Sequence, residues 1–133
     1  MESILKTKSI REVKKILKQN KLKLGGWGLP VNFRKDDEVF QKDLDKFPSL
    51  AKVAKTVECF RVFTWITPAS DILPFEENFR LHAQRLKAVA KVLGDYECIL
   101  GLEFVGPKTS RLNHKYEFIH TIDDILKLRE AMK

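Results

Sequence analysis

Hydrophobic and polar positions follow two different periods along this chain. Short apolar runs lie at about residues 22–31, 59–66 and 98–105, and the segments between them carry apolar residues at every third or fourth position. Apolar runs of this length predict strands, whereas spacing of three and four predicts helices that bury one face. Strands that alternate with helices form parallel sheets with right-handed crossovers. The predicted fold class is therefore α/β, with three parallel strands in the order αβαβαβα.

Capping and breaking residues predict where the helices begin and end. Ser9 and Glu12 form a capping box at the start of a helix expected from about residue 9 to 20. The next helical segment begins after Asp36, and Pro48 is expected to break it into two pieces. The next helix is expected to begin near Phe75, directly after a proline, and to end at Gly94. The last helix is expected to begin at the cap Thr121.

A single carboxylate lies inside the last apolar run. Residues 99–107 read Ile-Leu-Gly-Leu-Glu-Phe-Val-Gly-Pro, which predicts a strand that is buried on both faces. An ionised Glu103 is costly in such a place unless a cation, a metal or several donors meet it. It also lies near the carboxyl end of the strand, where parallel α/β folds bind ligands, so it is the first candidate catalytic residue. The alternative is that Glu103 points into water or pairs with a lysine.

Other residues with reactive or ligating side chains have simpler explanations. His82 lies on the apolar stripe of its helix and is expected to be a packed core histidine, because no second ligand is near it in sequence. Cys59 and Cys98 lack a CxxC pattern and are expected to be buried thiols of a reducing cytoplasm. The glycines at 25, 26 and 28 do not have phosphate-loop spacing; they leave room for a neighbouring side chain or for a ligand.

Composition and charge narrow the class of protein. A single domain over residues 1–133 is expected, with 44% hydrophobic and 32% charged residues, and no apolar run approaches the ~20 residues of a membrane span. We therefore expect a cytoplasmic protein without a membrane partner. The net charge of +7 comes from residues 1–35, which hold 10 Lys and Arg against 2 Asp and Glu. This basic region predicts a solvated helix face, and nucleic-acid binding is the less favoured alternative because no aromatic residues interleave with the charges.

Four segments in order resemble a known family. Residues 28–33, 61–66, 74–79 and 101–109 are similar to the xylose-isomerase-like barrels, a group of sugar phosphate isomerases and epimerases that includes the endonuclease IV-type enzymes. The resemblance spans about residues 22 to 130. It implies a metal-dependent sugar or sugar-phosphate isomerase or epimerase that uses Mg²⁺, Mn²⁺ or Zn²⁺ and no organic cofactor. It also makes Glu103 the counterpart of the first metal-binding glutamate.

The resemblance covers only about half of such a barrel. The family's further metal ligands, an aspartate, a histidine and a second glutamate, lie on strands beyond the counterpart of Met132. Other ligands to a metal at Glu103 would have to be His114, His120, water or another subunit. We therefore expect a half-barrel completed by a second copy or by a separately encoded half, and an inactive binding or assembly module of the same fold is the alternative.

A sugar or sugar phosphate is expected at the carboxyl ends of the three strands. Trp65 would offer an apolar face to a sugar ring, and Asn32 would hydrogen-bond its hydroxyl groups together with Glu103. Arg34 and Lys108 would hold a phosphate. The competing explanation is that Trp65 fills the core and the two cations are ordinary solvated charges.

Overall fold

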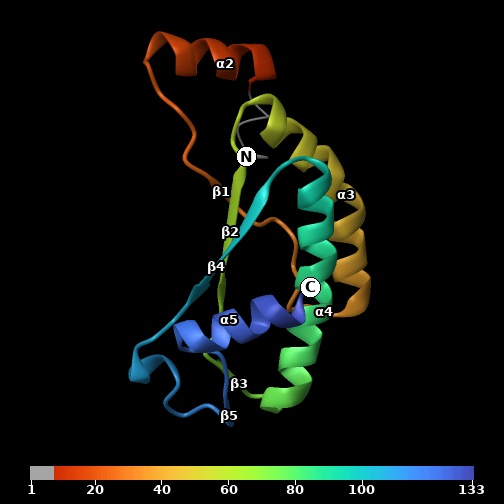
Figure 1. The fold of residues 1–133 in the computed structure, drawn as a ribbon, viewed down its shortest axis with the longest axis vertical. Helices are drawn as coiled ribbons and strands as arrows, with labels where there is room; N and C mark the ends of the chain where they lie inside the picture. Colours follow the sequence, from red (N-terminus) through yellow and green to blue (C-terminus); the bar gives the residue numbers. More distant parts are fainter. Residues whose placement is uncertain (1–7) are drawn as a thin grey trace. The chain divides into compact units, whose positions relative to one another are not determined.

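The computed structural model of the chain describes residues 8–133, and Figure 1 shows the order of its elements. The helices are α2 (Ile10–Gln19), α3 (Asp37–Thr56), α4 (Phe75–Asp95), the short 3-10 helix η1 (Lys108–Ser110) and α5 (Ile122–Ala131). The strands are β1 (Trp27–Gly28), β2 (Arg61–Ile66), β3 (Ala69–Ser70), β4 (Ile99–Phe104) and β5 (Tyr116–Glu117).

The main sheet has three strands in the order β1-β2-β4, all parallel. Trp27 pairs with Val62 and Gly28 with Phe63, and the backbone N–H of Ile99 donates to the carbonyl of Phe60 at 2.8 Å. The predicted α/β class with three parallel strands is confirmed. The strands are shorter than the apolar runs, most of all β1, since residues 22–26 lead up to the sheet without pairing in it.

The chain divides into two compact units. Among the described residues, the first consists of 8–63 together with 90–100, and the second of 64–89 together with 101–133. Strands β2 and β4 and helix α4 each contribute residues to both units. The units are described separately below as the first unit and the second unit.

Aromatic residues build the core of the first unit. The rings of Trp27 on β1 and Phe47 on α3 lie 6.0 Å apart, and Phe47, Ala51 and Ala54 are fully buried. Helix α2 begins as predicted, because the side chain of Ser9 accepts from the backbone N–H of Glu12 while the Glu12 carboxylate accepts from that of Ser9. None of the residues of α2 is buried.

The predicted break at Pro48 is wrong, because α3 continues through it for 20 residues. A proline inside a helix removes one backbone hydrogen bond at a cost of about 3 kcal/mol. Phe47 and Ala51 on either side of Pro48 are both 0% exposed, so the packing of one continuous helix offsets that loss. The helix starts at the predicted place, where the Asp36 carboxylate accepts from the backbone N–H of Val39 at 2.8 Å.

Helices α4 and α5 supply much of the second unit's core. His82 is buried, as predicted, with its Nδ1 2.8 Å from the carbonyl oxygen of Asn78 and its ring 4.9 Å from that of Phe118. Leu86 and Val89 are fully buried on the same stripe. Helix α5 begins at the predicted cap, where the Thr121 hydroxyl accepts from the backbone N–H of Asp124 at 3.2 Å.

Two stretches that the sequence predicts to be loops form a second, small sheet. Strand β3 pairs antiparallel with β5 through Ala69 with Glu117 and Ser70 with Tyr116 (Figure 1). The backbone N–H of Phe118 extends this contact by donating to the carbonyl of Pro68 at 2.7 Å. Strands of two residues are too short to show any periodicity in the sequence, so this pairing could not be predicted.

The expectation that the Glu103 strand is buried on both faces is wrong. Along β4 the residues on the side of Ile99, Gly101 and Glu103 are exposed, and Leu100 and Leu102 are half-buried. The apolar run forms a strand, but the described residues do not cover its second face. The argument that a buried charge marks Glu103 as functional therefore fails, and its candidacy rests on its position and on the family resemblance.

Candidate functional site

Five predicted site residues belong to the second unit, and Glu103, Trp65 and Lys108 are described first. Glu103 is the fifth residue of β4, and Trp65 is the fifth residue of β2. Lys108 is the first residue of η1, which follows β4 along the chain. All three side chains are exposed, and Trp65 is 50% exposed, which is not the burial expected of a core filler. Alternation explains this exposure on β2, where the next residue, Ile66, is 0% exposed; on β4 the next residue, Phe104, is itself 37% exposed.

The loop after β4 is fastened to the loop after β2. The carboxylate of Asp71 lies 2.9 Å from Nδ1 of His114 and accepts from the backbone N–H of Lys115 at 3.0 Å. These bonds lower the pKa of Asp71, the backbone N–H of Lys115 contributing most and His114 next. Within the same loop Arg111 donates to the carbonyl of Gly106 at 2.8 Å. The segment that carries Lys108 is thus held by specific contacts.

The two candidate metal histidines are engaged by their own surroundings. Nδ1 of His114 faces Asp71, and Nδ1 of His120 lies 2.7 Å from the carbonyl oxygen of Phe118. A carbonyl oxygen only accepts, so Nδ1 of His120 is the donor in this contact and is not available as a metal ligand.

No three ligands come together. Among residues 8–133 there is no group of three or more His, Cys, Asp and Glu side chains that could hold a metal ion. Glu103, His114 and His120 therefore do not form a metal site from the described residues alone. A divalent ion at Glu103 would need ligands from elsewhere.

Asn32 and Arg34 belong to the first unit, and each is occupied there. The side-chain amide of Asn32 donates to Asp43 on α3 at 2.6 Å, and its backbone N–H donates to the same oxygen at 2.9 Å. The guanidinium carbon of Arg34 lies 4.4 Å from the centre of the Phe33 ring, and burial lowers the pKa of Arg34. Asn32 therefore anchors the segment after β1 to α3, and a shared sugar site with the second unit's residues stays a prediction.

Sequence reasoning missed a buried polar group on α4. Asn78 and Arg85 are buried beside His82, although only His82 was singled out from the sequence. The signal was present in the spacing, since residues 78, 82 and 85 follow one another at four and three positions and so share one helix face. Asp71 was also missed, because its partners lie 43 and 44 residues away.

The parallel strands, crossover helices and exposed strand face together define the class: the chain has the fold of about half of a xylose-isomerase-like barrel. It is similar to a xylose isomerase domain protein from Alicyclobacillus acidocaldarius, with 26% identity and a TM-score of 0.89 over 98% of this chain and 46% of that one. It also matches the zinc-binding IolI protein, with 16% identity and a TM-score of 0.73 over 98% and 45% of the two chains.

A third similar structure is D-psicose 3-epimerase with D-tagatose from Clostridium cellulolyticum H10, with 15% identity and a TM-score of 0.73 over 98% of this chain and 47% of that one. At 15% and 16% identity the likeness concerns the fold alone. The chain spans less than half the length of all three structures. No family model and no curated protein sequence matches it.

Proposed function

We propose that this chain supplies one half of a sugar isomerase or epimerase barrel and becomes active when a second half covers its open strand face. The observation that carries the proposal is the match to just under half of a xylose isomerase domain protein and of a sugar epimerase. The exposed aromatic side of β2 and the exposed side of β4 support it, because both would be interior positions of a closed barrel.

The chemistry of the second unit's exposed residues suits a polyol. The indole face of Trp65 would pack against the C–H groups of a sugar, and the carboxylate of Glu103 would accept hydrogen bonds from its hydroxyl groups. Lys108 would place a positive charge near a sugar phosphate. Asn32 and Arg34 are proposed contributors from the first unit.

Metal chemistry is proposed only for the completed barrel. A single carboxylate is too few ligands for Mg²⁺, Mn²⁺ or Zn²⁺, so Glu103 would be one ligand and the second half would bring the others. Because the described residues do not fit a metal by themselves, no catalytic step is assigned to this chain alone. The second half is proposed to be another copy of the chain.

The test combines association with turnover. Sedimentation equilibrium measures the dimer fraction over a wide range of protein concentration, and NMR follows the isomerisation or epimerisation of ketohexoses and their phosphates with each of the three metals. We expect turnover to increase with the dimer fraction. Glu103→Gln should abolish turnover without changing association, whereas the matched control Glu76→Gln, an exposed glutamate at the start of α4, should change neither.

A second function is favoured by one observation, the lack of a ligand cluster in the part of the chain that the structure describes. On this alternative the chain is a binding or assembly module without catalysis. Association without turnover, and without any loss of metal binding in Glu103→Gln, would favour the module and contradict the enzyme.

A further inference from the structure

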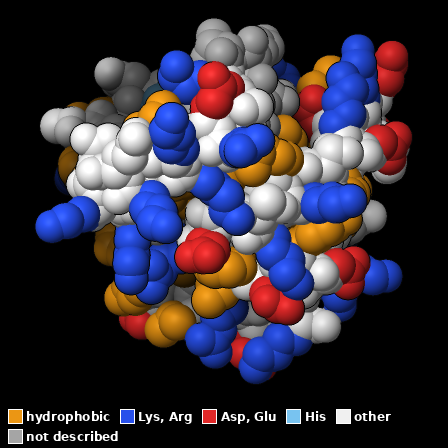
Figure 2. Space-filling model, turned by 90° about the horizontal axis from the view of Figure 1, so that it is seen from above, with side chains coloured by type: hydrophobic (Ala, Val, Ile, Leu, Met, Phe, Trp, Pro, Cys, Tyr) orange, Lys and Arg blue, Asp and Glu red, His pale blue; other side chains and the backbone are white. Residues whose placement is uncertain are grey.

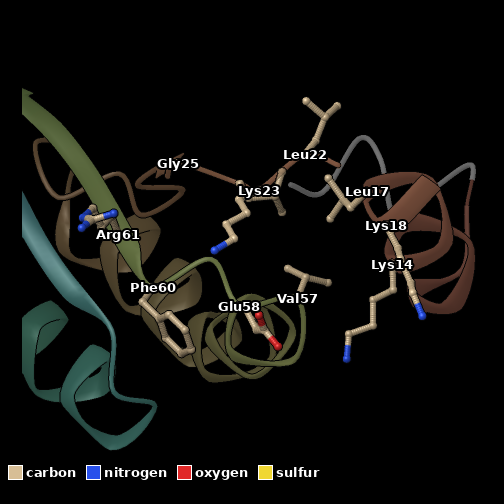
Figure 3. A pocket seen from close by; sticks show the side chains of 11 residues that line it. Lys14, Leu17, Lys18, Leu22, Lys23, Gly25, Val57, Glu58, Phe60 and Arg61 are labelled. Atoms are coloured by element: carbon tan, nitrogen blue, oxygen red, sulfur yellow. The ribbon is translucent and has the colours of Figure 1, made fainter. Parts of the chain in front are cut away.

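A groove in the first unit lies where β2 begins. Its walls are α2, the extended segment 22–25 that leads to β1, and residues 57–61, where α3 ends and β2 begins (Figure 3). It has a volume of ≈ 750 Å³. This lies within the range of about 300–1,000 Å³ that is typical of sites for small organic ligands. We call it the basic groove.

Positive charge dominates the basic groove. Lys14 and Lys18 come from α2, and Lys23 and Arg61 from the other walls, with Glu58 as the single lining acid. Within residues 8–133 none of these four cations forms an ion pair or a hydrogen bond through its side chain. Figure 2, which views the protein from above, shows many Lys and Arg side chains together with fewer Asp and Glu and with hydrophobic ones. The groove therefore offers several cations that have no acidic partner in the described chain.

The remaining lining is apolar. It consists of Leu17, Leu22, Leu24, Val57 and Phe60, together with Gly25. Leu22 is 59% exposed, and the apolar stripe of α2 has no buried residue. In Figure 3, Leu17 and Val57 come from facing walls, and the ammonium group of Lys23 points away from α2. An occupant that brought hydrocarbon into this space would remove apolar surface from water.

We infer that the basic groove binds a small amphiphilic anion, in which a phosphate or carboxylate group is attached to a hydrocarbon body. Lysine ammonium groups at the rim attract the anionic head as point charges, and Arg61 adds a planar pair of donors. The leucines and Phe60 cover the hydrocarbon body. A bare phosphate lacks the apolar part and a neutral hydrocarbon lacks the charge, so each alone binds weakly. This site is separate from the proposed sugar site and does not depend on it.

The probe is decyl phosphate, kept below the concentration at which it forms micelles, and titrated into the full chain. Calorimetry gives the affinity, and backbone amide shifts locate the site. Shifts are expected in residues 14–25 and 57–61. Inorganic phosphate and decyltrimethylammonium should each bind at least about tenfold more weakly, because each lacks one of the two interactions.

Two matched pairs of variants test the two halves of the groove. Lys14→Gln with Lys18→Gln should weaken binding about tenfold. Arg11→Gln with Lys15→Gln removes the same charge from the same helix outside the groove and should change the affinity less than about twofold. Leu22→Ser should weaken binding by several fold, whereas Leu112→Ser, a similarly exposed leucine in the second unit, should not.

Three results would overturn the inference. Equal weakening by both charge pairs would mean that the anion is held by diffuse positive charge. Shifts centred on residues 63, 65 and 99 would mean that the amphiphile coats the exposed strand face. No measurable heat and no shifts with a fold that circular dichroism shows to be intact would mean that the groove has no affinity for this class of ligand. All substitutions are at exposed or half-buried positions, so the fold should persist.

Discussion

The two faces of β2 both carry apolar side chains, and the larger ones are on the exposed face. Val62 and Ile66 are 0% exposed, whereas Phe63 and Trp65 are 53% and 50% exposed. The residues of both faces suit a strand equally well, so hydrophobicity does not separate them. The difference is that one face is covered by the described chain and the other is not. Apolar content in a strand therefore predicts burial only when a partner layer is present.

The same contrast continues on β4. Ile99 is 66% exposed, although isoleucine is among the residues most often buried. Large apolar side chains exposed on a strand face are typical of surfaces that meet another protein segment. The comparison between covered and open faces leads to four predictions.

The largest effect is expected on the covered face. Ile66→Ala should lower the free energy of unfolding by about 2–5 kcal/mol, because a fully buried side chain leaves a cavity. Trp65→Ala, although it removes more atoms, should cost about 1 kcal/mol or less in the monomer. Urea unfolding at low protein concentration measures both. Equal losses would show that Trp65 is covered and that the two faces do not differ.

A smaller loss is expected where β1 meets the open face. A Cβ added at Gly26 would lie 2.9 Å from the carbonyl oxygen of Arg61 and 3.0 Å from the ring of Phe63. Gly26→Ala should therefore cost about 1–3 kcal/mol by urea unfolding. Gly28→Ala is the control, because its added Cβ would meet nothing within 4 Å. A loss at both glycines would point to backbone conformation as the cause.

The open face itself should change association more than stability. Phe63→Gln combined with Trp65→Gln should alter the free energy of unfolding of the monomer by about 1 kcal/mol or less. The dimer measured by sedimentation equilibrium should weaken by at least about tenfold, since buried aromatic anchors dominate interfaces. Ile72→Gln with Leu112→Gln, two exposed apolar residues of the loops, should leave the dimer unchanged. Similar dimers in both pairs would exclude the strand face as the interface.

The smallest effect is expected at the contact between the two loops of the second unit. The pKa of Asp71 is lowered from 3.8 because it accepts from the N–H of Lys115 and faces His114. Its contribution to stability is therefore present above pH 3.8 and is lost as the pH falls through the lower folded-state value. A lower protection factor of the Lys115 amide, which is its exchange rate relative to the intrinsic rate at each pH, should report this loss.

The control for this pH dependence is charge removal. In the Asp71→Asn variant the Lys115 amide should already exchange faster than in the wild type at neutral pH. Its protection should then change less as the pH is lowered. Asp95→Asn, an exposed aspartate at the end of α4, should keep the wild-type profile. An unchanged profile in Asp71→Asn would show that the carboxylate does not hold the loop.

Local signals in the sequence predicted most of the helices. The capping box at Ser9 and the acidic start at Asp36 are complete within a few residues, so α2 and α3 begin where they were expected. The stripe that contains His82 fixed the covered side of α4 for the same reason. The break at Pro48 was wrong, because the burial of Phe47 and Ala51 depends on tertiary packing that no local pattern contains.

The site was harder to predict than the fold. Its residues were chosen by position at strand ends, and the structure adds partners that come from distant segments, such as Asp43 for Asn32 and Asp71 for His114. The exposure of Glu103 could not be read from its neighbours, since an apolar run looks alike whether its second face is covered or open. The sequence pattern does not show whether another layer covers the second face of β4.

The exposure of Glu103 has a consequence for solubility. Strand β4 lies at an edge of the sheet, where unpaired backbone groups can recruit strands of other molecules and begin aggregation. The other five residues of β4 are Ile, Leu, Gly, Leu and Phe, a composition that favours such stacking. A carboxylate in their midst opposes it by repulsion between stacked copies. This effect of Glu103 on aggregation does not depend on any catalytic role.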